Sequence, residues 1–96
     1  MFIHHVFFWL KEDADHAAFK AGLDALIKSP MVKEAYLGVA AKSDREVVED
    51  SFDFSLLVFF ENKENHDIYQ TTDEVHQVFI DTCKDMWTKV QVFDAI

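Results

Sequence analysis

The order of periodic segments predicts an α+β fold in which strands and helices follow one another as βαββαβ. Apolar runs of strand length lie near residues 2–10 and 52–60, and helical apolar stripes fill the segments that follow each run. The chain has 96 residues, enough for one hydrophobic core and a single domain over residues 1–96. We therefore expect one four-stranded antiparallel sheet with its helices on one face.

The first strand is predicted over residues 2–10, a nearly unbroken apolar run rich in Phe, Val and Ile. Such a run is typical of a strand that is covered on both faces. A helix is expected next, from about residue 15 to residue 28, and Pro30 ends it. The residues at the spacing of one buried helix face are Phe19, Leu23, Leu26 and Ile27.

The middle of the chain predicts two more strands. Residues 34–41 alternate in character, and the polar segment 42–50 reads as a long connection. Residues 52–60 give the clearest strand of the sequence, because large apolar side chains fall at every second position. Its predicted faces are Phe52, Phe54, Leu56, Val58 and Phe60 on one side and Asp53, Ser55, Leu57 and Phe59 on the other.

The last third of the chain predicts a pair of helices and a strand. Asn62 is a suitable N-cap for a short helix, and residues 71–73 interrupt it with Thr-Thr-Asp, which favours turns and caps. A second helical stripe continues to about Trp87. The final strand is expected over residues 89–94, with alternating faces.

This order of elements is the split βαβ arrangement called ferredoxin-like. Right-handed crossovers place both helical segments on one side of the sheet, so the other face would expose Leu57, Phe59 and residues of the first strand. A second copy of the chain is the simplest cover for that face. We therefore predict a homodimer in which two sheets pack face to face as an α+β barrel with the helices outside.

Composition excludes several classes of partner. Nine basic against eighteen acidic residues give a net charge of −9, which makes nucleic acid and anionic membrane surfaces poor partners. The N-terminal segment lacks the cationic region and cleavage site of a signal peptide, so a cytoplasmic location is expected. Cys83 is the only cysteine, so no disulfide or Cys-based zinc site can form within one chain, and it is interpreted as a core residue.

Two segments of the sequence are distinctive, residues 5–11 (HVFFWLK) and residues 50–61 (DSFDFSLLVFFE). They resemble the first and third strands of the stress-responsive A/B barrel (Dabb) family. The terminal Val92-Phe93-Asp94 also matches, so the resemblance covers almost the whole chain. It implies the same ferredoxin-like fold and a homodimer through the helix-free sheet face.

The resemblance also implies a site between the sheet and the helices. Members that cyclise polyketides use a Tyr and a His from the segment between the two later helices, and Tyr69 and His76 take those positions here. This sequence departs from the family pattern, because QTTDEV separates the two residues, the usual His-Pro is absent and the spacing is one residue longer. An imidazole can act as a general base near neutral pH, and a phenol can hold an enolate oxygen.

Further ligand-binding residues are expected from the strands. The resemblance suggests that the face carrying His5, Phe7 and Trp9 points toward the helices and any cavity, with Asp94 on a neighbouring strand. Phe54 stands where cyclising members have a second pocket histidine, so it can fill space but cannot move a proton.

Neither a metal nor a cofactor is predicted. The pair His4-His5 cannot chelate one ion, because adjacent strand residues point to opposite faces, and no H-E-x-x-H pattern occurs. With only two glycines the chain has no glycine-rich phosphate loop.

Three functions are compatible with these observations. The favoured one is the binding of a small hydrophobic molecule between sheet and helices. The second is a cofactor-free enzyme of polyketide-cyclase, isomerase or monooxygenase type, and the third is a structural dimerisation module. A cavity of about 300 Å³ or more with converging polar groups would favour the first two.

Overall fold

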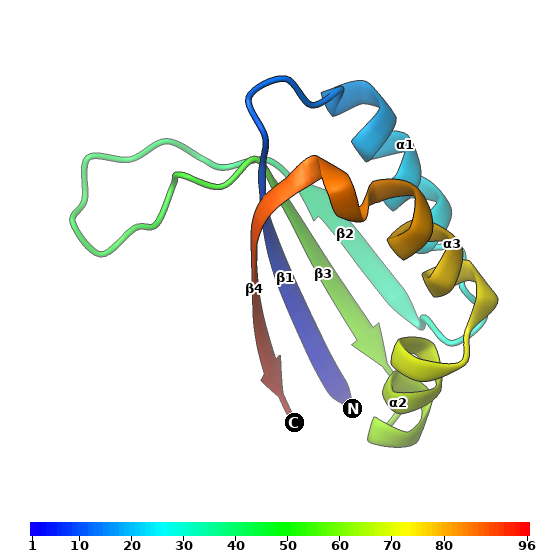
Figure 1. Ribbon diagram of the computed structural model, residues 1–96. Helices are drawn as coiled ribbons and strands as arrows, with labels where there is room; N and C mark the ends of the chain where they lie inside the picture. Colours follow the sequence, from blue (N-terminus) through cyan, green and yellow to red (C-terminus); the bar gives the residue numbers. More distant parts are fainter.

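The computed structural model describes residues 1–96, and its elements follow the predicted βαββαβ order with the second helical segment divided in two (Figure 1). The elements are β1 (Phe2–Leu10), α1 (His16–Leu26), β2 (Glu34–Gly38), β3 (Phe54–Phe60), α2 (Lys63–Thr71), α3 (Glu74–Cys83), a 3-10 turn (Lys84–Met86) and β4 (Trp87–Ala95). None of the helices combines the length and the apolar character that a membrane-spanning helix requires.

The four strands form one sheet in the order β2-β3-β1-β4, and every neighbouring pair is antiparallel. Figure 1 shows all three helices on one side of this sheet, with both chain termini at the same end of β1 and β4. The predicted ferredoxin-like fold is therefore confirmed. In this register His4 of β1 lies opposite Val58 on β3 and Asp94 on β4.

The core forms between the helices and one face of the sheet. Burial alternates strictly along β1 and β3, so every second residue is buried and the others are partly exposed. The buried face of β1 packs against apolar side chains from all three helices. Those helix residues are Phe19, Leu23, Leu26, Tyr69, Phe79 and Cys83. Because the two faces are so different, the register of β1 decides which of its histidines faces the helices.

Acidic and amide side chains fix where the helices begin. The carboxylate of Asp15 accepts the Ala18 N–H at 3.0 Å at the start of α1, and Asn62 accepts the Asn65 N–H at 2.8 Å at the start of α2. Each cap satisfies an N–H that has no partner within the helix. The cap at Asn62 was predicted from the sequence, whereas α1 ends at Leu26, before the expected residue 28.

The structure corrects three strand boundaries. β2 ends at Gly38, not at residue 41, and β4 begins at Trp87, not at residue 89. β3 begins at Phe54, and the placement of Phe52 on the helix side is wrong, because its ring packs on Phe7 and Trp9 at 4.9 and 6.4 Å between centroids. The reason is local. The carboxylate of Asp53 accepts the Leu10 N–H at 2.7 Å, and its own N–H donates to Phe8 O, which interrupts the alternation before β3.

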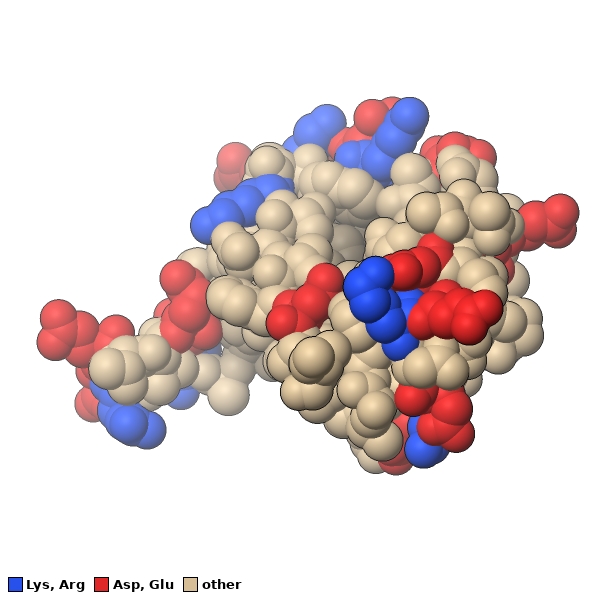
Figure 2. All heavy atoms as spheres, turned by 90° about the horizontal axis from the view of Figure 1, so that it is seen from below, with Lys and Arg blue, Asp and Glu red and all other residues tan.

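The long connection between β2 and β3 projects from the end of the sheet. Figure 1 shows residues 39–53 extending away from the helices, and Figure 2 shows this segment standing clear of the body with acidic and basic side chains on it. Val47 near its tip is 81% exposed. The segment contributes no residue to the hydrophobic core.

Candidate functional site between the sheet and the helices

A cavity of about 520 Å³ lies between the sheet and the helices, with fifteen lining residues of which ten are hydrophobic. Side chains of β1 and β4 form one wall, among them Val6 and Val92. Phe79 and Ile80 of α3 lie on the opposite side. This make-up, mostly apolar with a few polar groups, is typical of small-molecule sites, and the volume exceeds the roughly 300 Å³ set as the lower bound.

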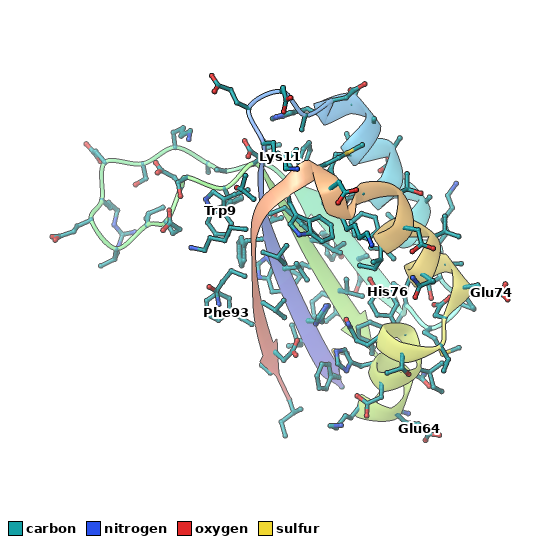
Figure 3. All side chains as sticks on the ribbon, in the orientation of Figure 1. Trp9, Lys11, Glu64, Glu74, His76 and Phe93 are labelled. Carbon is teal, nitrogen blue, oxygen red and sulfur yellow. The ribbon has the colours of Figure 1, made fainter.

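Tyr69 and His76 both line the cavity, and their ring centroids are 4.7 Å apart. Tyr69 is fully buried in α2, and this burial raises the pKa of its hydroxyl, which is therefore protonated at neutral pH. His76 is partly buried in the first turn of α3, and its burial lowers the pKa of the imidazole, partly offset by the nearby charge of Asp73. Figure 3 shows His76 on the sheet side of α3, whereas Glu74 points outward.

The junction between α2 and α3 explains how the altered spacing still brings this pair together. The N–H groups of Thr72 and Asp73 both donate to Ile68 O, at 2.9 and 3.0 Å, so the chain turns within two residues. Asp73 then caps α3 by accepting the Val75 N–H at 2.9 Å, and it also accepts a hydrogen bond from the hydroxyl of Ser29, which is buried after α1. The extra residue is contained in this turn, and the imidazole of His76 still faces the cavity.

His4 is the histidine of β1 that faces the helices. Its Nδ1 lies 2.6 Å from Oδ1 of Asp94 on the adjacent strand β4, and both residues line the cavity. Because a carboxylate only accepts, Nδ1 carries the proton and donates it, which leaves Nε2 as an acceptor in the neutral ring. Burial lowers the pKa of His4, against the opposing effect of Asp94, so the neutral form is favoured.

The predicted placement of His5, Phe7 and Trp9 toward the helices is wrong. Adjacent strand residues alternate between faces, and the side chains that line the cavity from β1 are those of His4, Val6 and Phe8. Figure 3 shows Trp9 on the side of the sheet opposite to His76. His4 therefore lies on the helix side of the sheet.

Phe54 and Asp94 are on the expected side of the sheet, but only Asp94 reaches the cavity. Phe54 is buried against the start of α1, with its ring centroid 5.5 Å from that of Phe19 and 5.8 Å from that of His16. It therefore fills the far end of the core and does not line the cavity.

His66 of α2 also lines the cavity, although it is not among the site residues predicted from the sequence. Its ring stacks on Phe2 with centroids 4.1 Å apart and lies 5.0 Å from the ring of His4. Its Nδ1 lies 3.0 Å from the carboxylate of Asp67. The sequence does carry a signal for this position, because His66 and Tyr69 are three residues apart and therefore lie on one face of the helix. That signal points to the cavity only when this helix face is known to be buried.

The family comparison settles the classification. Residues 2–96 match the Stress Responsive A/B Barrel Domain. The chain belongs to the Dabb family. No curated protein sequence matches it.

Several solved structures share the fold of this Dabb domain at low sequence identity. Hydroxynitrile lyase from Passiflora edulis is 18% identical with a TM-score of 0.82, and the match covers 99% of this chain and 91% of that one. A Dabb family protein from Mesorhizobium loti has 16% identity, a TM-score of 0.75 and coverage of 99% and 94%. A dimeric ferredoxin-like protein from Thermobifida fusca has 14% identity, a TM-score of 0.74 and coverage of 98% and 88%. At these identities the likeness shows the fold alone.

In this Dabb domain the cavity holds polar groups of complementary character. The hydroxyl of Tyr69 is a donor at neutral pH, while neutral His4 and His76 each keep one ring nitrogen as an acceptor. Such a set can bind a carbonyl or hydroxyl group of an otherwise apolar molecule. It can also move a proton between two nearby atoms of that molecule.

Proposed function

We propose that this Dabb domain binds a small, mainly apolar molecule in the cavity between its sheet and its helices. The cavity itself carries this proposal, because about 520 Å³ lined mainly by hydrophobic side chains is large enough to enclose a molecule of one or two rings. Tyr69, His4 and His76 would orient a ligand that has one polar group. An anionic ligand is disfavoured, because the carboxylate of Asp94 also lines the cavity and the neutral groups return too little for the desolvation of a negative charge.

Fluorescence titration with N-phenyl-1-naphthylamine, a neutral apolar dye, tests this proposal. Ile80→Trp places an indole in the cavity, whereas Val78→Trp adds the same side chain at a position of α3 that is 62% exposed. We expect the first change to abolish or strongly weaken dye binding and the second to leave it near the unmodified level. Absence of binding, or equal loss in both variants, would contradict the proposed pocket. Native mass spectrometry of freshly purified protein then identifies any retained natural ligand.

A second candidate function is cofactor-free proton-transfer chemistry, and the 4.7 Å separation of the Tyr69 and His76 rings favours it. Neutral His76 would remove a proton from a carbon next to a carbonyl group. The hydroxyl of Tyr69 would donate a hydrogen bond to the enolate oxygen that develops. Cyclase, isomerase and lyase reactions share this step.

Exchange of the methyl protons of acetophenone in D₂O, followed by NMR, measures this step directly. We expect exchange faster than in buffer, and a loss of about 10²–10⁴-fold in His76→Ala with the fold retained. His16→Ala is the control, because His16 is exposed and lies outside the cavity. Exchange at the buffer rate, or equal exchange in His76→Ala, would rule out this chemistry and leave binding alone.

We also propose that the domain is a homodimer through the helix-free face of the sheet. Solved proteins of this fold are described as dimeric, and Phe93 on this face is 61% exposed. Three partly exposed aromatic residues, Phe7, Trp9 and Phe59, lie on the same face. Together these side chains expose more apolar surface to solvent than is usual for a monomeric domain. Light scattering coupled to size exclusion should give twice the chain mass of 11.2 kDa. A dimer without any dye binding would favour the third function, a structural dimerisation module.

A further inference from the structure

A second cluster of polar groups lies where β1 begins and β4 ends. His4, His66 and Asp94 each offer one ligand atom, and the three atoms lie within 4.8 Å of one another. They come from β1, α2 and β4, so only the folded chain assembles them. Imidazole nitrogens and a carboxylate oxygen are the ligands that zinc takes in sites with one open position. We propose that these three residues bind a divalent transition-metal ion of the Zn²⁺ class.

The orientation of His66 is the first independent support. The carboxylate of Asp67 only accepts, so Nδ1 of His66 carries the proton in their 3.0 Å contact and Nε2 keeps a lone pair. Nε2 is buried and has no hydrogen-bond partner. Buried polar atoms are nearly always paired, so such an atom requires an explanation. A metal ion would supply the partner, and metal-binding histidines usually donate their other ring N–H to a carboxylate, as His66 does.

The pair of His4 and Asp94 completes the set. His4 is almost fully buried, with 7% of its side chain exposed, while Asp94 is 41% exposed and lies near the end of an edge strand. Ligands about 2.0–2.1 Å from a tetrahedral ion are about 3.4 Å apart, so donor atoms that are now up to 4.8 Å apart must approach by up to about 1.4 Å. Rotation of the partly exposed Asp94 side chain can provide part of this movement. Its charge also offsets half of the charge of the ion, in a chain whose net charge is −9.

The site would be open on one side. All three residues line the cavity, so an ion held by them would present its remaining coordination position to the cavity. The expectation of no metal came from spacing along the sequence, which cannot detect ligands at positions 4, 66 and 94. This inference does not depend on the proposed function, because metal binding is measured without any organic ligand.

Calorimetric titration of untagged, EDTA-treated protein with Zn²⁺ alone tests the site. We expect one ion per chain, a loss of affinity of at least about 100-fold in His66→Ala, and a smaller loss of about 10–100-fold in Asp67→Ala. His16→Ala is the matched control and should keep the unmodified affinity, because His16 is exposed and lies outside the cavity. Absence of binding overturns the proposal. Several weak sites per chain that persist in His66→Ala also overturn it, because surface carboxylates would then be the ligands.

A second measurement needs no substitution of His4, because replacing this buried residue can unfold the chain. In the unmodified protein, two-dimensional NMR of the imidazole nitrogens should show the signals of His4 and His66 moving on addition of one equivalent of Zn²⁺. Those of His5 and His16 should not move. The reverse pattern would overturn the assignment. Failure of Zn²⁺ binding would leave dye binding to the apolar cavity unaffected, so the two proposals are tested separately.

Discussion

Replacement of Gly22 tests how closely α1 and α3 pack. A Cβ added at Gly22 would lie 2.6 Å from Sγ of Cys83 on α3, about 1 Å inside an ordinary contact of roughly 3.5–4.0 Å. Overpacking of this kind costs about 1–3 kcal/mol, whereas Ala in place of Gly within a helix contributes about 1 kcal/mol of stability. We therefore expect Gly22→Ala to destabilise the domain by up to about 2 kcal/mol. For a domain of this size each kcal/mol lowers Tm by roughly 4–8 °C.

Thermal unfolding followed by circular dichroism measures this effect, and two further variants isolate its cause. Ala21→Gly, at an exposed neighbouring position of α1, reports the helix propensity difference alone. Cys83→Ala removes the sulfur, so the double variant with Gly22→Ala should show a favourable coupling of about 1 kcal/mol or more. If Gly22→Ala raised Tm by as much as Ala21→Gly lowers it, the helices would not be in close contact. The placement of His76, which α3 carries, would then lose its support.

Three other properties are open to direct measurement. Burial lowers the pKa of both β1 histidines and of His76, so the contribution of these residues to stability should be full above about pH 6.5 and fall as the pH decreases toward the folded pKa values. The difference between the urea midpoints at about pH 7.5 and 5.5 should be smaller in His76→Gln than in the unmodified protein. An equal difference in both proteins would contradict this prediction. Leu57→Asp should dissociate or unfold the proposed dimer, whereas Val47→Asp in the projecting segment should leave it intact, as measured by light scattering. A dimer that survived Leu57→Asp would exclude the helix-free face as the dimer interface. Asp15→Ala should cost about 1 kcal/mol in urea unfolding because Asp15 caps α1, and an equal cost in Asp13→Ala would show that the cap is not responsible.

Local patterns in the sequence determined the fold. The range of β1 was predicted to the residue, because its charged flank and unbroken apolar run leave no alternative. The cap at Asn62 and the break between α2 and α3 followed from side chains that bond to neighbouring backbone groups. The pairing of Tyr69 with His76 came from family resemblance, and the short turn between their helices allows it despite the altered spacing. These features depend on residues that are close in the chain.

The tertiary structure alone decided which face of β1 meets the helices. Both faces of this strand are apolar and each carries one histidine, so alternation predicts two sets of side chains without saying which set is inside. Pairing with β3 and β4 resolves it, because it places His4 beside Asp94 and beneath α2, where His66 also lies. The cavity and the His4, His66 and Asp94 cluster therefore arise from contacts between residues up to 90 positions apart. No local pattern encodes such contacts, since they depend on the register of the whole sheet.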